Sequence, residues 1–98
     1  MEIRTLKYFL AVAREQNMTE AANVLFVNQP TLSRQMADLE KELGKKLFVR
    51  TNRSTTLTEE GMHLRQRAEE ILALVDQTKE EIREDDMDLS GCIRIGAG

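Results

Sequence analysis

Polar and basic side chains, together with one proline and one alanine, follow one side of the segment NQPTLSRQMADLEKELG, residues 28–44. At about 100° per residue, a helix places them opposite or beside its apolar residues. They are Gln29, Pro30, Ser33, Arg34, Ala37 and Lys41. Amide, hydroxyl and guanidinium groups arranged in this way can hydrogen-bond a partner or bind an anion. A solvated helix surface has similar residues, so this pattern alone leaves both interpretations open.

Further basic residues follow that segment, with no acidic residue between Leu43 and Leu57. They are Lys45, Lys46, Arg50 and Arg53. Residues 1–57 have nine Lys and Arg against six Asp and Glu, a net charge of +3. Residues 58–98 have five against eleven, a net charge of -6. This asymmetry indicates an anion-binding part joined to a solvated acidic part.

Three helices are expected to position these side chains. Apolar spacing predicts the first from Ile3 to Ala13, through Leu6, Phe9 and Leu10. Thr19 is the expected N-cap of a short second helix containing Ala21, Ala22, Val24 and Leu25. The sequence leaves open whether Phe26, in the turn that follows, packs on the first helix or is exposed.

The third helix has clear signals at both ends. Asn28 is an expected N-cap, and Pro30 falls in the first turn, where its missing N–H has no partner to lose. Its apolar stripe is Leu32, Met36, Leu39 and Leu43. Gly44 follows as the residue able to take the left-handed conformation that ends a helix.

A small β-hairpin is predicted after Gly44. LFVR and STTL are rich in β-branched and aromatic residues and flank Thr51-Asn52-Arg53, where Asn52 suits a turn with positive φ. We expect Arg53 at the tip of this hairpin and Arg50 at its base.

A long helix is predicted from Glu59 to about Met87, roughly 40 Å at 1.5 Å per residue. Thr58 is its expected N-cap, and Gly61 stands where a capping box would have Glu. A 3.5-residue repeat predicts a coiled-coil seam for a partner chain. The seam residues are Leu64, Ala68, Ile71, Val75, Thr78 and Ile82.

The remaining signals exclude other classes of protein. Cys92 and His63 are the only residues of their types, so we expect neither a metal site nor an enzyme. No apolar run approaches the ~18 residues of a membrane span, and there is no signal peptide, so a cytoplasmic protein is expected. Cys92 to Ile95 is predicted as a strand without a pairing partner, as at the front of a longer protein.

The second and third predicted helices are joined by a short turn, which predicts a helix-turn-helix, and the basic hairpin after them predicts a wing. In such a motif the second of its two helices, here the third helix of the chain, enters the major groove of DNA. The segment AANVLFVNQPTLSRQMADLEKELGKKLFVRTNR followed by LTEEG resembles the DNA-binding domain of the LysR-type transcriptional regulators. The resemblance covers nearly the whole chain. It implies a mainly α fold: a winged helix-turn-helix in residues 1–57, a dimerising linker helix in 58–88 and the start of an effector domain in 89–98.

The resemblance also implies a function and its residues. The chain is expected to bind an interrupted palindrome in double-stranded DNA as a homodimer, or as a tetramer at full length, and to regulate transcription. The implied DNA-binding residues are Thr19, Gln29, Pro30, Thr31, Ser33, Arg34, Lys41, Arg50 and Arg53. No cofactor is expected in these residues, because the small-molecule effector would bind the C-terminal domain. A coiled-coil interaction module whose basic face is incidental remains the alternative.

Overall fold

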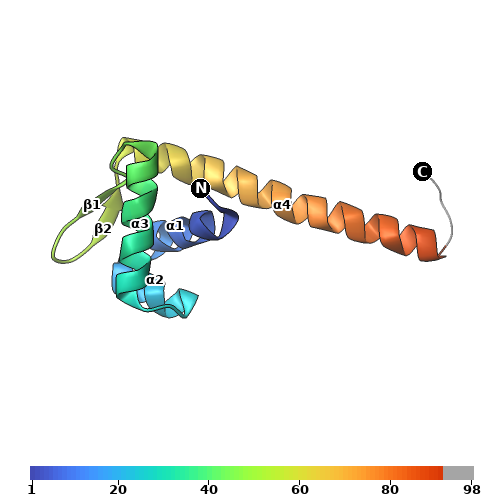
Figure 1. Cartoon of the computed structure of the whole chain (residues 1–98), viewed down its shortest axis with the longest axis horizontal. Helices are drawn as coiled ribbons and strands as arrows, with labels where there is room; N and C mark the ends of the chain where they lie inside the picture. The colour runs from blue at the N-terminus through green and yellow to red at the C-terminus, as the bar shows by residue number, and fades with distance from the viewer. Residues whose placement is uncertain (92–98) are drawn as a thin grey trace.

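The computed structural model describes residues 1–91, and the side chains of residues 1–84. The elements are α1 (Ile3–Glu15), α2 (Met18–Leu25), α3 (Gln29–Leu43), β1 (Phe48–Arg50), β2 (Thr55–Leu57) and α4 (Glu59–Gly91). Figure 1 shows three helices and the hairpin gathered at one end of α4, which extends away from them. The predicted winged helix-turn-helix with a long last helix is therefore confirmed. The strand predicted at Cys92 to Ile95 lies outside the described residues.

The core lies between α1, α2, α3 and the hairpin. The rings of Phe9 and Phe48 meet at its centre, with their centroids 5.3 Å apart. The buried face of α1 is formed by Leu6, Phe9, Ala11 and Val12. Ile3 is 40% exposed. The predicted apolar face of this helix was therefore partly wrong, because Val12 rather than Ile3 completes the side that packs on the core.

The second helix begins one residue earlier than Thr19. Asn17 has the extended backbone of an N-cap, with φ -158 and ψ 123, and its side chain accepts a hydrogen bond from the Glu20 N–H. Thr19 lies inside the first turn and is exposed. The prediction that Thr19 caps this helix was wrong, because Asn17 has both the side-chain oxygen and the backbone conformation that capping requires.

The turn between α2 and α3 exposes an aromatic side chain. Phe26 has φ 59 and ends α2 in the left-handed conformation. Its side chain is 93% exposed. Phe26 therefore lies on the surface and does not pack against α1.

The third helix begins and ends at the predicted residues. The side chain of Asn28 accepts a hydrogen bond from the Thr31 N–H at 2.8 Å. Gly44 has φ 71, and its N–H donates to the carbonyl of Glu40. The buried residues of this helix are Leu32, Met36 and Leu39. Leu43 is 39% exposed, so the buried stripe stops one turn before the predicted end.

The hairpin pairs Phe48 with Leu57 and Arg50 with Thr55. Because the Arg50–Thr55 pair lies next to the turn, the prediction that Arg50 is at the base of the hairpin was wrong. Among the described residues other than glycine, only Gln16 and Phe26 have positive φ, so the turn does not need the left-handed Asn52 that we expected.

Local and tertiary bonds fix the position of this hairpin. The Thr51 N–H donates to the carbonyl of Ser54 and closes the turn at 2.8 Å. The Thr55 N–H donates to the carbonyl of Gln16 at 2.9 Å, which joins the hairpin to the junction of α1 and α2. The wing is therefore attached to the helices near its tip as well as through the core.

The long helix starts as predicted, and its first turn explains the missing capping-box residue. The Gly61 N–H donates to the Thr58 hydroxyl at 3.0 Å. A Cβ atom added at Gly61 would clash with the carbonyl oxygen of Leu47. A Glu is therefore excluded at this position by the chain that passes beside it. The helix continues to Gly91, past Met87 where we expected its end.

Candidate nucleic-acid interface

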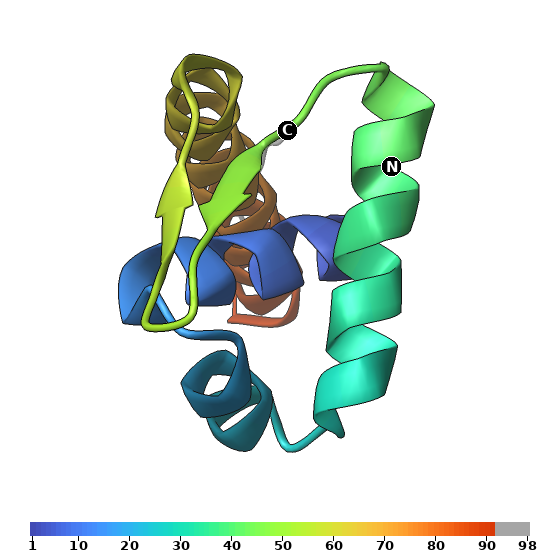
Figure 2. The same cartoon turned by 90° about the vertical axis from the view of Figure 1, so that its left-hand side faces the viewer.

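The predicted polar surface of α3 is accessible. Gln29, Pro30, Thr31, Arg34 and Lys41 are exposed, and Ser33 is half-buried. Viewed as in Figure 2, α3 and the hairpin lie toward the viewer on the two sides of α1, and α4 recedes behind them. The exposed N-terminal half of α3 and the wing therefore face the same side of the molecule.

Four of the predicted DNA-binding residues meet between the wing and the helices. Thr19, Gln29, Arg50 and Arg53 line one polar hollow of about 260 Å³. The rest of its lining comes from residues 17 and 18 at the start of α2 and from the hairpin residues 51, 52, 54 and 55. Thr19 thus lies at this surface although it is not the helix cap. An open hollow with two guanidinium groups and several N–H and hydroxyl donors is suited to a phosphate group.

Arg34 is about 100° around α3 from Ser33 and belongs to the same exposed face of the helix. It lines a hollow of about 470 Å³ together with Thr31 and with Arg4 from α1. Asp38 and Glu42 are also in this lining. Within the described residues, no carboxylate lies within the 4.0 Å ion-pair distance of the Arg34 guanidinium. Its donors are therefore available to a ligand outside the chain.

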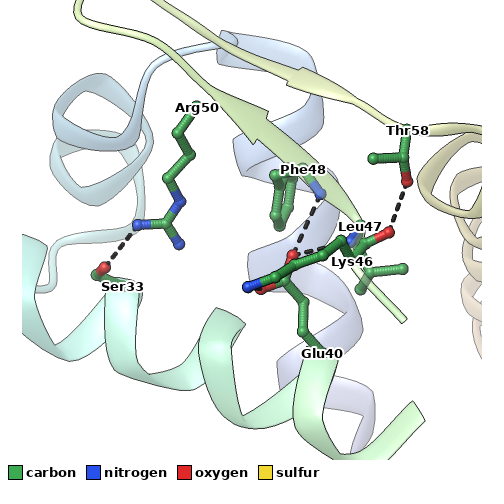
Figure 3. A network of polar contacts seen from close by, with 7 residues as sticks. All are labelled: Ser33, Glu40, Lys46, Leu47, Phe48, Arg50 and Thr58. Atoms are coloured by element: carbon green, nitrogen blue, oxygen red, sulfur yellow. Dashed lines mark hydrogen bonds and ion pairs between the residues drawn. The ribbon is translucent and has the colours of Figure 1, made fainter. Parts of the chain in front are cut away.

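An arginine of the wing is bonded to α3. Nη1 of Arg50 donates to Oγ of Ser33 at 3.0 Å, as Figure 3 shows. Ser33 therefore has a partner within the chain, which the sequence did not predict. The bond directs Arg50 toward α3, and the other nitrogen atoms of its guanidinium keep donors for a further acceptor.

The structure also gives one carboxylate a set of partners that the sequence analysis missed. The Glu40 side chain is 11% exposed, and its Oε2 atom accepts hydrogen bonds from the N–H groups of Leu47 at 2.8 Å and Phe48 at 3.2 Å (Figure 3). Lys46 Nζ lies 3.9 Å from its Oε1 atom. The signal that could have revealed it is position: Glu40 is four residues after Met36 and therefore at the edge of the buried stripe.

The predicted dimerisation residues fall into two groups. Ala68 is fully buried, and Leu64 packs against the core of its own domain. The prediction that Ala68 contacts a partner chain was wrong, because its side chain is already fully buried within its own chain. Further along, Ile71 and Val75 are half-buried, and Thr78 and Ile82 are exposed.

One more apolar residue widens the accessible face of α4. Leu74 is 60% exposed and lies four residues before Thr78, on the same side of the helix. The Thr78 hydroxyl donates to the carbonyl of Leu74 at 2.7 Å, so it is satisfied within the helix. The face that remains for a partner is thus more apolar than its sequence pattern indicates.

The described residues offer no metal site or membrane span. No group of three or more His, Cys, Asp or Glu residues in the described part of the chain could hold a metal ion. Every helix in residues 1–91 is too short or too polar to span a bilayer. The polar surface formed by α3 and the wing is therefore the best-defined candidate site.

Comparison with known proteins agrees with the winged helix-turn-helix fold. Residues 3–62 match the family model for bacterial regulatory helix-turn-helix proteins of the lysR family. The HTH-type transcriptional regulator BudR of Klebsiella aerogenes is 46% identical over 96 residues, which are 98% of this chain and 67% of BudR. BsdA of Bacillus subtilis (strain 168), another such regulator, is 42% identical over 98 residues, which are 99% of this chain and 34% of BsdA. The chain thus spans about a third of BsdA.

A solved structure shows the same architecture. The DNA-binding domain of CbnR, crystallised in complex with DNA, has a TM-score of 0.85 and 42% sequence identity. The match covers 88% of this chain and 99% of the CbnR chain. These likenesses assign the class: a winged helix-turn-helix domain with a long C-terminal helix. The chain belongs to the lysR family of bacterial regulatory helix-turn-helix proteins.

Proposed function

We propose that this chain is the DNA-binding part of a transcription regulator, which binds double-stranded DNA sequence-specifically as a homodimer. The observation that carries the proposal is the surface on which the exposed N-terminal half of α3 lies beside Arg50 and Arg53 of the wing. An α-helix fits the major groove, and a wing beside it reaches the phosphates or the minor groove. Membership of the lysR family and the CbnR complex with DNA support this function.

Each side chain on this surface has a role that its chemistry allows. The amide of Gln29 pairs with adenine, the guanidinium of Arg34 pairs with the O6 and N7 atoms of guanine, and Pro30 packs on a thymine methyl group. Thr31, Ser33 and Lys41 add contacts along α3. Thr19, Arg50 and Arg53 bind phosphate groups around the hollow that they share with Gln29.

The proposed dimer forms through the accessible face of α4. Ile71, Val75, Thr78 and Ile82 are the seam residues that remain available to a partner, and Leu74 extends the same face. A two-fold dimer presents two copies of α3, so its preferred site is an interrupted palindrome. The full-length protein is a dimer or a tetramer.

The rest of the proposed assignment concerns the division of the chain. Residues 1–57 form the DNA-binding domain and residues 58–91 the linker helix with its N-cap, so the proposed start of the effector domain moves from residue 89 to the residues after Gly91. A small-molecule effector binds that domain, and residues 1–88 bind no cofactor. The protein is cytoplasmic and is not an enzyme, in keeping with relatives that are transcriptional regulators.

The proposal is tested by the salt dependence of binding to a mixed-sequence duplex. Each phosphate contact lowers the slope of log K against log salt by about 0.9. We expect the doubly substituted variant, Arg50→Ala with Arg53→Ala, to have a slope shallower than that of the original chain by about 1.8. Fluorescence anisotropy at several salt concentrations measures both slopes.

The matched control removes an arginine from the linker helix. Arg67 pairs with Glu70 on α4 at 2.9 Å and lies outside the proposed surface. Arg67→Ala should leave the slope unchanged. A chain that dimerises but has no salt-dependent affinity for the duplex would contradict the proposal and favour the coiled-coil interaction module.

A further inference from the structure

The segment Lys46–Phe48 is held from two sides. On one side, the Glu40 carboxylate of α3 accepts the Leu47 and Phe48 N–H groups. On the other side, the hydroxyl of Thr58, the N-cap of α4, donates to the carbonyl of Lys46 at 2.7 Å. The Thr58 N–H also donates to the carbonyl of Leu47 at 3.0 Å. Figure 3 shows Glu40 and Thr58 on opposite sides of this segment.

The strand geometry explains why Glu40 is needed. The Thr58 bond to Leu47 and the Thr51 bond to Ser54 flank the two strands and place residues 47, 49 and 51 at the hydrogen-bonded positions of the ladder. The Phe48 N–H therefore points away from β2 and toward α3. The Glu40 side chain is 11% exposed, so the carboxylate gives this part-buried donor an acceptor in a region that solvent barely enters.

From this geometry we infer that Glu40 is a positioning residue for DNA recognition, which fixes the wing and the start of the linker helix relative to α3. Glu40 is the only group in Figure 3 that bonds the Leu47 and Phe48 amides. Thr58 connects the same segment to α4, and Gly61 packs against the Leu47 carbonyl. A short, rigid path thus runs from α3 through Lys46–Phe48 to α4.

The inference rests on the proposed function and extends it. Arg50 is two residues after Phe48 and Arg53 lies in the following turn, so the direction of β1 decides where both guanidinium groups meet the phosphates. Without the Glu40 carboxylate, β1 is no longer held against α3 by these two bonds. The wing arginines are then expected to lose their fixed position although neither residue has changed.

A pair of substitutions separates positioning from simple folding. Glu40→Met keeps an unbranched side chain and a good helix former but removes both oxygen atoms. Glu40→Gln keeps one oxygen atom, which suffices because a single Glu40 oxygen accepts both N–H groups. Circular dichroism and thermal unfolding of the 98-residue chain check that each variant is folded.

The first readout needs no DNA. We expect amide hydrogen exchange at Leu47 and Phe48 to become about tenfold faster or more in Glu40→Met, because local opening is then easier, while amides of the α1 core keep their protection. Glu40→Gln should exchange nearly as slowly as the original chain. Unchanged protection of Leu47 and Phe48 in Glu40→Met would overturn the inference.

The second readout measures the effect on the wing with a mixed-sequence duplex. Glu40→Met should make the salt slope shallower by about 1.8, as the loss of Arg50 and Arg53 does. It should cause no further change in a chain that already lacks both arginines. Faster exchange with an unchanged slope would also overturn the inference, and so would equal additional loss in the arginine-free chain.

Failure of the proposed function would be distinguishable. If the original chain has no affinity for the duplex, the proposed function fails, and the inferred role of Glu40 in recognition is overturned with it even where exchange shows that Glu40 holds the segment. If Glu40→Met does not fold, Glu40→Asp replaces it. The Asp side chain is shorter by one methylene group, so its carboxylate no longer reaches the two N–H groups. Asp should then show the same loss of protection and slope relative to Gln.

Discussion

Replacing Arg34 with alanine is expected to weaken binding to the preferred DNA site by about 1–3 kcal/mol, or roughly 5- to 150-fold, and to remove the preference for one base pair. The physical reason is that Arg34 is exposed on α3 and, among the described residues, no carboxylate lies within ion-pair distance of it. Its two parallel donors can therefore pair with guanine. Parallel titrations of the preferred duplex and of random duplexes measure the effect.

Random duplexes separate base recognition from charge. On them, Arg34→Ala should cost much less, since only a general electrostatic attraction is lost. Arg65→Ala is the charge-matched control, because Arg65 is an exposed residue of α4 away from the proposed surface. An equal loss on preferred and random DNA would show that Arg34 does not recognise a base.

Replacing Val75 with aspartate is expected to weaken the dimer by about 100-fold or more. Val75 lies in the middle of the accessible seam between Ile71 and Ile82. A polar group buried without a partner costs about 1–3 kcal/mol, and a symmetric dimer contains two copies of the new carboxylate. Sedimentation equilibrium measures the dissociation constant, and binding to a palindrome should become binding to separate half-sites.

Ala73 provides the matched control for the Val75 substitution. It is exposed on the opposite side of α4, so Ala73→Asp introduces the same charge in the same turn but outside the seam. This variant should dimerise as the original chain does. If both aspartate variants dimerise equally well, the dimer does not form through this face of α4.

The elements with strong local signals were predictable from the sequence. Asn28, Pro30 and Gly44 determine the beginning and end of α3 through capping and backbone conformation, which depend on neighbouring residues only. Thr58 begins α4 for the same reason. The exposed face of α3 was predictable from the helical spacing of its apolar residues. These signals were sufficient to predict the winged helix-turn-helix.

The features that depend on tertiary contacts were not predictable. Apolar residues at seam spacing have the same pattern whether they pack on a partner chain or on their own domain. Ala68 was therefore assigned to a partner chain although it is buried within its own chain. Asn17 and Thr19 both have capping side chains, and the backbone at Asn17 decided between them. In the sequence, Glu40 is indistinguishable from a surface carboxylate, because its partners belong to the segment that leads into β1. The partner of Ser33 is likewise a residue of the wing, 17 positions away in the chain.

The central claim is that two copies of α3, held by a dimer, recognise bases. Its most direct test is to select duplexes bound by this chain from a random pool at near-physiological salt and to sequence them. The account predicts enrichment of an interrupted palindrome, with half-sites that change when Gln29 or Arg34 is replaced. Binding that depends on salt but enriches no sequence would contradict it, because this surface would then bind the phosphate backbone alone.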